Sequence, residues 1–501
     1  MKKILMYSQL LIQYQIILGM FFFNSVYSSM FPNAYQYEIS KTNLKTRGLN
    51  SYNIPFVDAQ MAIPLKEKDE RRVGLYCIGM FLESTNTDFG CAFSIDRKSN
   101  MKVAGDNTDY KDSRDIRAEF VGGTSYTNVD MSLLGKEDMQ GCKVLLQFPL
   151  ANLFKIDFFD DWFFSVRTSL VRLERQLLMK LEGSPDNALL SIRNFFANTT
   201  QQCKIDSKLH TKIDLENITF SLDGIYKTKH DALEIYYYTG IEIPTNLTYN
   251  TPYLFDAIVG NNGNIGLLLG ADFHGYFYNT MNKRVGFILE IENHFLLYKT
   301  IDRTFDLYDQ QYFGGLSRPN KNKPWSRYLP AVLLDNQNER LLVADISTLP
   351  VRMHECNDLD VSLGLAYNFI NKNDTKFYFV GGYNIWMSQP EYLELQDRVY
   401  PEEYHKFYNY GIAGTQPNTT SSQTTIKSQL ENDLILKNFN INDLDYGSVP
   451  SSGSYSQSVF LRGSVFGCSG YSILLGGWYE IGKLKMAPSR IGFWIGGGCE
   501  F

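Results

Sequence analysis

Apolar and polar residues alternate at the end of the chain, and this alternation restricts the structures that the chain can adopt. The odd positions carry Ile491, Phe493, Ile495, Gly497, Cys499 and Phe501, whereas the even positions are polar or small except for Trp494. Successive side chains of a β-strand point to opposite faces, so a period of two predicts a strand with one apolar face. The segments 471–481 and 459–465 alternate in the same way, and Ser469-Gly470 supplies a tight turn between them. The sequence therefore predicts three antiparallel strands in an up-and-down meander.

A second hairpin, at 265–277 and 285–297, predicts which face of these strands meets lipid. Its apolar positions alternate with positions that hold ionisable side chains, namely Asp272, His274, Glu290, Glu292 and His294. A charge on the lipid face of a membrane barrel costs roughly 2–4 kcal/mol near the midplane. We therefore expect these five side chains to point inward and to line a hydrated pore. A metal or acid–base cluster is the alternative use of the same five residues.

Further alternating segments at 233–243, 359–369 and 377–387 extend the pattern over most of the chain. Strands of about 10 residues match the length that a tilted strand needs to cross a bilayer. The predicted fold class is all-β: an antiparallel up-and-down transmembrane β-barrel over 71–501, with an even number of strands, about 12–14.

Composition supports this fold class and excludes two others. The chain has 33 Tyr, 34 Phe and 38 Gly, and its net charge is −6. Beyond the N-terminus we find no run of about 18 apolar residues, which excludes a helical multi-pass membrane protein. The weak negative charge leaves no basic stripe to neutralise phosphates, so we expect no nucleic-acid partner.

The N-terminus has the order of a secretory signal. Lys2 and Lys3 precede an apolar stretch at 16–23, and Val26 and Ser28 stand before a cleavage point after Ser28. Such a segment is too short for a comfortable transmembrane helix, which needs roughly 20 apolar residues. We predict a signal peptide at 1–28, with a retained anchoring helix as the alternative. An irregular periplasmic lead-in is predicted at 29–70.

Two later segments lack strand periodicity. Residues 183–203 contain a short helical pattern, which predicts either a plug in the lumen or a helical turn in an outer loop. Residues 389–457 are polar and rich in Gln, Thr, Ser and Asn. That composition predicts a long extracellular loop, because membrane barrels keep their long loops on that side.

The seven cysteines are scattered at 77, 91, 142, 203, 356, 468 and 499, without the close spacing of a zinc or redox motif. An exported chain can form disulfides. Cys77 with Cys91 and Cys468 with Cys499 are the two pairs that hairpin neighbourhood suggests. The alternative is that these cysteines are small apolar residues of a barrel wall.

Several short stretches resemble a family of predicted outer-membrane proteins from amoeba-associated intracellular Gram-negative bacteria. They are the residues 255–263 (FDAIVGNNG), 303–307 (RTFDL), 325–329 (WSRYL) and 441–445 (INDLD). The terminal Phe501, with Phe493, Ile495 and Cys499 in phase behind it, resembles the C-terminal signal that the bacterial barrel-assembly machinery recognises. The family resemblance spans about residues 70–501; it implies a barrel in the outer membrane and supplies no catalytic residues.

The sequence favours a porin-like barrel that forms a passive diffusion channel for small solutes or ions. Arg167 and Arg175, on a predicted strand at 162–175, would set a transverse field against the acidic hairpin. A non-conducting surface barrel that acts as an adhesin or structural protein is the alternative. We assign no catalytic residues, cofactor or metal and expect no enzyme. The expected partners are outer-membrane lipid, the assembly machinery and the solutes, and a homo-oligomer is left open.

Overall fold

The computed structural model describes most of the chain after residue 72. The described residues are 46–49, 52, 73–110, 113–150, 161–184, 186–199, 202–228, 232–245, 252–261, 263–280, 282–307, 325–333, 340–354, 357–371, 375–394, 410–412, 444–451, 453–467, 470–482 and 487–500. The predicted signal peptide at 1–28, the assembly signal Phe501 and the cysteine Cys468 lie outside these residues.

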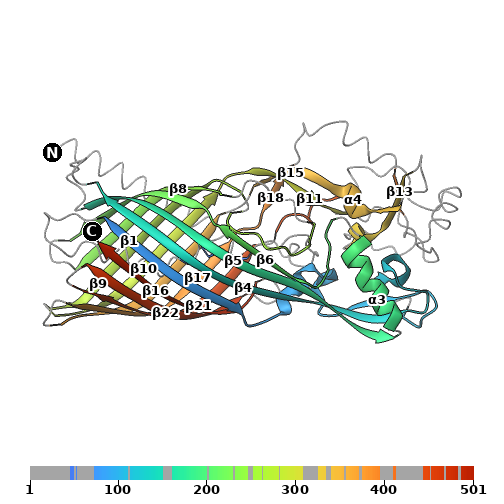
Figure 1. Ribbon diagram of the computed structural model, residues 1–501, viewed down its shortest axis with the longest axis horizontal. Coiled ribbons are helices and arrows are strands. Elements are labelled where there is room, and N and C mark those ends of the chain that lie inside the picture. Colours follow the sequence, from blue (N-terminus) through green and yellow to red (C-terminus); the bar gives the residue numbers. More distant parts are fainter. Residues whose placement is uncertain are drawn as a thin grey trace.

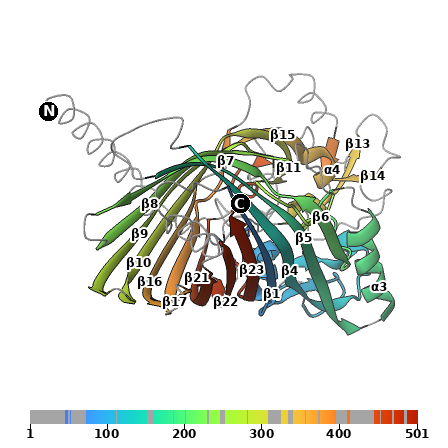
Figure 2. The ribbon, with the colours of Figure 1, turned by 60° about the vertical axis from the view of Figure 1, so that its left-hand side comes forward.

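Twelve antiparallel strands close into a barrel (Figures 1 and 2). In chain order they are β1 (Gly74–Ser84), β4 (Asn128–Pro149), β5 (Asp161–Ser184), β7 (Ile218–Lys227), β8 (Leu233–Ile243), β9 (Gly266–Asn279), β10 (Lys283–Leu296), β16 (Asp358–Ile370), β17 (Lys376–Ser388), β21 (Ser454–Phe466), β22 (Tyr471–Gly482) and β23 (Arg490–Glu500). Each strand pairs with the next in the chain, and β1 pairs with β23 to close the ring, from Gly74↔Glu500 to Ser84↔Arg490. The predicted all-β up-and-down barrel, and its even strand number, are confirmed.

The alternation in the sequence separates the outer face of this barrel from its inner face. On β23 the outward Ile491, Phe493 and Ile495 are more than half exposed, whereas the inward Arg490 and Trp494 are buried. On β21 the outward Leu461 is 68 % exposed and the inward Arg462 is buried. An exposed apolar belt of this kind is the surface that a membrane barrel presents to lipid tails.

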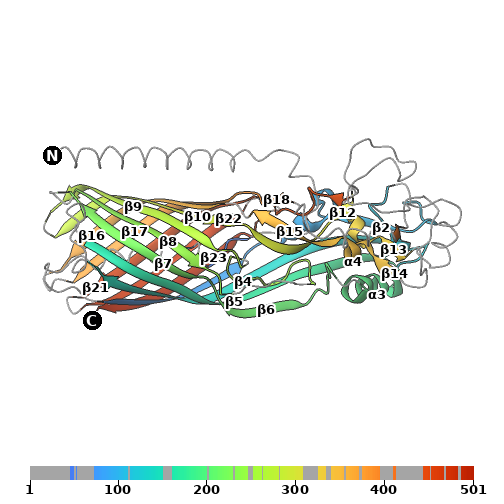
Figure 3. The same ribbon diagram turned by 90° about the horizontal axis from the view of Figure 1, so that it is seen from above.

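The two ends of the barrel differ. At one end, which we call the turn rim, only a few residues of the chain separate β7 from β8, β9 from β10, β16 from β17 and β21 from β22. At the other end, the loop rim, longer segments leave the wall and fold together as a loop region. The loop region comprises the described residues within 85–127, 185–208, 252–265, 297–357 and 389–453, with the distal ends of β4 and β5. It forms the right-hand part of the molecule in Figures 1 and 3.

The loop region is built on the hairpin of β4 and β5, which runs past the barrel and stays paired as far as Asn128↔Ser184. The strands β2 (Met101–Ala104) and β3 (Ile116–Arg117) extend the sheet beside β4, and β6 (Leu209–Leu215) pairs with β5. Smaller sheets hold the remaining strands: β11 (Lys299–Thr304), β12 (Asp306–Leu307), β13 (Pro330–Leu333), β14 (Arg340–Leu342), β15 (Thr348–His354), β18 (Tyr392–Glu394), β19 (Tyr410–Ile412) and β20 (Leu444–Asp445). The short helix α4 (Val343–Ser347) lies between β14 and β15.

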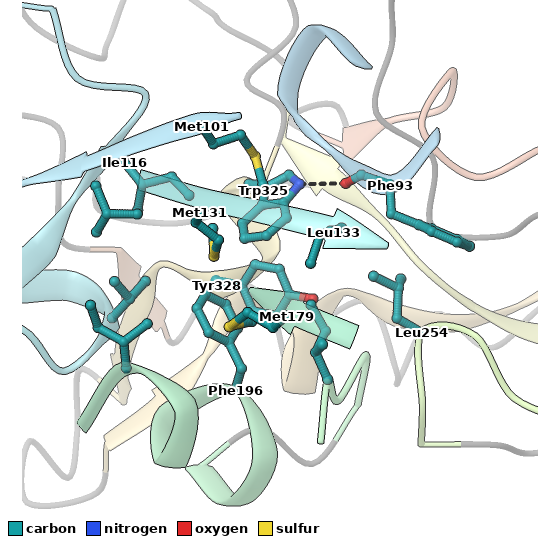
Figure 4. Packing of buried hydrophobic residues seen from close by; sticks show 14 of the residues in the cluster. Phe93, Met101, Ile116, Met131, Leu133, Met179, Phe196, Leu254, Trp325 and Tyr328 are labelled. Atoms are coloured by element: carbon teal, nitrogen blue, oxygen red, sulfur yellow. Dashed lines mark hydrogen bonds between the residues drawn. The ribbon is translucent and has the colours of Figure 1, made fainter. Parts of the chain in front are cut away.

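The helical pattern at 183–203 forms the helix α3 (Asp186–Asn194) and a π-helical turn at Phe195–Thr199. Both lie in the loop region and not in the lumen, so the outer-loop alternative is the correct one (Figure 1). The buried Ile192 and Phe196 belong to a core that also contains Trp325 and Tyr328. Figure 4 shows Phe196 packed beside Trp325 and Tyr328. Of the predicted loop at 389–457, the described parts include β18, β19 and β20, and β21 already begins at Ser454. Residues 395–409 and 413–443 lie outside the described residues.

Candidate functional site

The barrel interior carries many buried charges, and the negative ones are in excess. Among the barrel-strand residues whose burial the structure describes, nine carboxylates and five basic side chains are buried, which leaves a formal excess of four negative charges. The acids are Glu137, Asp223, Glu234, Glu242, Asp272, Glu290, Glu292, Asp360 and Glu480, and the bases are Lys143, Arg167, Arg175, Arg462 and Arg490. Buried charges are rare in water-soluble cores, because desolvation is expensive unless a partner compensates it.

The structure places all five ionisable residues of the predicted hairpin on the inner face. Glu290 lies opposite Asp272 in the β9–β10 ladder and accepts a hydrogen bond of 2.6 Å from Arg462. His294 lies 2.9 Å from a Glu292 oxygen and 3.1 Å from a Glu242 oxygen. The ring nitrogen Nδ1 of His274 lies 3.2 Å from the Tyr378 hydroxyl. Among the described residues, neither oxygen of the buried Asp272 has a hydrogen-bond partner. Whether these residues line a conducting pore stays a prediction.

The two predicted arginines have different surroundings. Arg167 reaches the acidic hairpin directly, with Nη1 at 3.8 Å from Glu292 Oε2, and it also lies 3.9 Å from Asp223. Arg175 instead pairs with Glu137 of β4 at 2.7 Å. The arginines therefore do not form a single basic wall across from the hairpin, and a transverse field of the predicted form does not follow from this arrangement.

Residues that the sequence did not point to lie inside the barrel. In the segment predicted as a periplasmic lead-in, Thr46 donates a 2.8 Å hydrogen bond to Glu137, and the Leu49 amide donates one of 3.0 Å to Glu216. The Arg490 guanidinium donates to the Tyr52 hydroxyl at 2.8 Å, and Lys143 Nζ donates to the Tyr52 carbonyl at 2.7 Å. We call the described residues 46–49 and 52 the inner segment. The sequence of the inner segment lacks the alternation of a strand, so its pattern did not predict a place inside the barrel. The excess of inward carboxylates is the sequence signal that could have indicated a basic partner such as Arg47.

Aromatic rings fill the part of the lumen next to the inner segment. The Tyr52 ring lies 5.0 Å from Trp478, and Trp478 lies 5.1 Å from Trp494, between ring centroids. These two indoles lie over glycines of the neighbouring strand, Trp478 over Gly492 and Trp494 over Gly476. A side chain larger than hydrogen at either glycine would overlap the ring, so glycine is what allows the indoles to lie flat against the wall.

The cysteine geometry differs from the predicted Cys77–Cys91 pair. Cys91 is buried in the loop region, in the 3-10 helix Asp88–Phe93. Cys77 of β1 instead faces Cys142 of β4, with their sulfur atoms 3.0 Å apart. The strands β1 and β4 are paired in the wall. The sequence did not predict the Cys77–Cys142 pair, because the prediction considered only cysteines on segments close together in the chain. The predicted Cys468–Cys499 pair includes Cys468, which lies outside the described residues.

Two further observations concern only the described residues. No group of three or more His, Cys, Asp and Glu side chains in this part of the chain is arranged to hold a metal ion. No helix in the same part of the chain combines the length and the apolar character needed to cross a membrane.

The closed ladder, the apolar belt and the charged interior define the class of protein: a twelve-stranded transmembrane β-barrel. No family model and no curated protein matches the chain. Among solved structures, the chain is similar to an outer membrane channel of Pseudomonas putida F1, with 8% identity over 87% of this chain and 100% of that chain and a TM-score of 0.37.

The chain is also similar to two autotransporter domains. The β-domain of the Bordetella autotransporter BrkA has 6% identity over 86% of this chain and 100% of that chain, with a TM-score of 0.32. The transport unit of AIDA-I from Escherichia coli has 7% identity over 90% of this chain and 98% of that chain, with a TM-score of 0.33. Similarity at this level carries no functional argument, and the fold class rests on the strand pairing of this chain.

Proposed function

We propose that the protein is an outer-membrane channel for small cationic solutes, which its own inner segment closes in the conformation described above. The excess of four negative charges on the inner face of the barrel is the observation that carries the proposal. The apolar belt requires a bilayer, and single-chain barrels of this architecture are proteins of bacterial outer membranes. The long-loop end of such barrels faces outward, so the loop region would lie at the cell surface.

A charged interior supports a channel over a mere membrane anchor for an energetic reason. Replacing buried ion pairs by apolar side chains of similar volume is often neutral or stabilising. A barrel that served only as an anchor would gain stability from an apolar filling. Inward charges are instead useful to a protein that admits water and ions, because rings of charged side chains select the sign of the permeating ion.

The test is single-channel recording in a planar bilayer, after a heat-modifiability gel has verified that the full-length refolded protein is a barrel. We expect stepwise openings in a KCl gradient, with a reversal potential on the cation side, and more frequent openings for Arg47→Ala than for wild type. Glu234→Gln should lower the cation preference, because it removes an inward charge while the amide oxygen can still accept the hydrogen bond from Arg284. Glu182→Gln, at a position whose side chain is 64% exposed in the loop region, is the matched control and should not change it.

Two outcomes would overturn the proposal. One is a folded barrel that stays silent in both wild type and Arg47→Ala, and the other is a preference for chloride. The first outcome would favour the second candidate function, binding at the cell surface. The loop region supports that candidate because it has a core of its own, which joins residues as distant in sequence as Phe93, Phe196 and Trp325 (Figure 4).

A further inference from the structure

The guanidinium of Arg47 lies in a site that the barrel wall provides. Its Nη2 donates to Asp360 of β16, and its Nη1 donates to Asn384 Oδ1 of β17 at 3.1 Å. Glu480 of β22 lies 3.9 Å from Nη1, and the Trp386 ring lies 5.9 Å from the guanidinium carbon. Arg47 and these four wall residues are all at most 5% exposed. The wall thus surrounds one guanidinium with a carboxylate, an amide oxygen, a second carboxylate and an aromatic ring.

The wall residues are oriented for this guanidinium by contacts of their own. The Asn384 amide nitrogen donates to Asp360 and, at 3.0 Å, to Ser362, so its oxygen is turned towards Arg47. Ser458 of β21 donates to the same oxygen at 3.3 Å. Two acceptors that receive different nitrogens of one planar group match a guanidinium better than a compact ammonium.

Charge balance indicates that the site needs a cation that is not part of the wall. Glu137 pairs with the wall residues Arg175 and Arg490, and Arg490 also lies 3.7 Å from Glu480. Asp360 has an ion pair only with Arg47 among the described residues. The wall network of three carboxylates and two guanidiniums therefore has one negative charge in excess, which Arg47 neutralises. A buried carboxylate without a counter-charge is costly, so the site favours any cation that fits it.

We propose that Asp360, Asn384, Trp386 and Glu480 form a binding site for solutes that carry a guanidinium group, and that Arg47 occupies this site as an internal competitor. The inference rests on the proposed channel function for the entry of such a solute. Binding itself can be measured whether or not the protein conducts. Arg47 and the solute would compete for the same wall residues. The channel would therefore open more readily when the solute is present, because the bound solute displaces Arg47.

In the experiment, methylguanidinium is titrated into the full-length refolded Arg47→Ala variant in detergent micelles, and binding is measured by calorimetry. The same titration with methylammonium is the matched comparison. We expect methylguanidinium to bind at least about tenfold more tightly than methylammonium, since only the planar group can donate to both acceptors at once. Wild type should bind it far more weakly, because Arg47 holds the site. If Arg47→Ala does not fold, Arg47→Gln takes its place, because the amide still donates towards Asp360.

A second substitution, made in the Arg47→Ala variant, distinguishes binding at the proposed wall site from a general attraction of cations to the negatively charged lumen. Adding Asp360→Asn to Arg47→Ala should abolish the preference, whereas adding Asp214→Asn on β6 should leave it unchanged. Equal affinities for the two probes, or a preference that survives Asp360→Asn, would overturn the site. If the protein binds methylguanidinium preferentially but never conducts, the proposed channel function is wrong and the binding site stands. If it conducts but does not bind methylguanidinium preferentially, the binding site is wrong and the channel function stands.

Discussion

The barrel and the loop region each have a buried interior, and the two interiors differ in the balance of charged and apolar side chains. The barrel interior holds nine carboxylates and five basic side chains beside an apolar cluster that includes Trp478 and Trp494, and the wall carries an exposed apolar belt on its outer face. The loop region encloses an apolar core, in which residues such as Phe93, Ile192 and Trp325 are buried together. The difference follows from the surroundings: lipid accepts the apolar side chains of the barrel wall, whereas water around the loop region drives such side chains inward. The same substitution should therefore have a different effect on stability in each of the two regions.

The largest effect is expected for the buried ion pair of the loop region. Arg327 Nη1 lies 3.0 Å from Asp306 Oδ2, and both side chains are almost fully buried. Arg327→Met keeps an apolar side chain of similar length but leaves Asp306 without its counter-charge, which should destabilise the loop region by about 3–5 kcal/mol. Hydrogen exchange in the loop region measures this loss. The matched control is Lys98→Met, which removes the half-exposed partner of Asp115 and should cost at most about 1 kcal/mol.

The pH dependence of this loss has a defined sign. Burial raises the pKa of the Asp306 carboxyl above its ordinary value, although Arg327 opposes the shift. Removing Arg327 raises the pKa further, so the folded variant holds a proton more tightly than the unfolded chain does. The penalty is then fully present above the folded pKa of the variant and fades as the pH falls from there towards the ordinary pKa of an aspartate, about 4. A gap between variant and wild type that stays constant over this range would show that the buried charge is not its cause.

The next effect contrasts two exposed leucines. Leu461 on the barrel belt is 68% exposed and Leu190 on α3 is 60% exposed. Leu461→Arg should cost roughly 2–4 kcal/mol, because it places a charge against lipid, whereas Leu190→Arg should change the free energy by less than about 0.5 kcal/mol. The free energy of unfolding of both variants is measured by urea unfolding in lipid vesicles, with tryptophan fluorescence as the signal. Equal losses at the two positions would mean that the belt does not face a bilayer.

The contrast between the regions also explains which features the sequence revealed. Alternation at 490–500 and on β9 and β10 assigned residues such as Arg490 and Glu290 to the inner face, because the face of a strand is a local property with a period of two. The position of Arg47 is not local: its partners Asp360 and Glu480 lie hundreds of residues away in the chain. A short helix at 183–203 was predictable from its pattern, but its place outside the lumen depends on distant partners such as Trp325.

The smallest effect concerns the glycines that allow aromatic rings to fill the barrel. A Cβ atom at Gly476 would overlap the indole of Trp494, which is buried in the lumen. Gly476→Ala should therefore force the ring to shift and cost about 1–3 kcal/mol through overpacking.

The matched control is Gly381→Ala on the lipid face, where the nearest atom to the new Cβ is 3.6 Å away and the backbone is in an ordinary strand conformation. This substitution should be neutral or stabilise by up to about 1 kcal/mol, because alanine restricts the unfolded chain. Urea unfolding in vesicles compares the pair, and the near-ultraviolet circular dichroism of the indoles should change only for Gly476→Ala. If both substitutions behaved alike, the rings would not be held by contact with the wall, and the lumen would be more loosely packed than the core of the loop region.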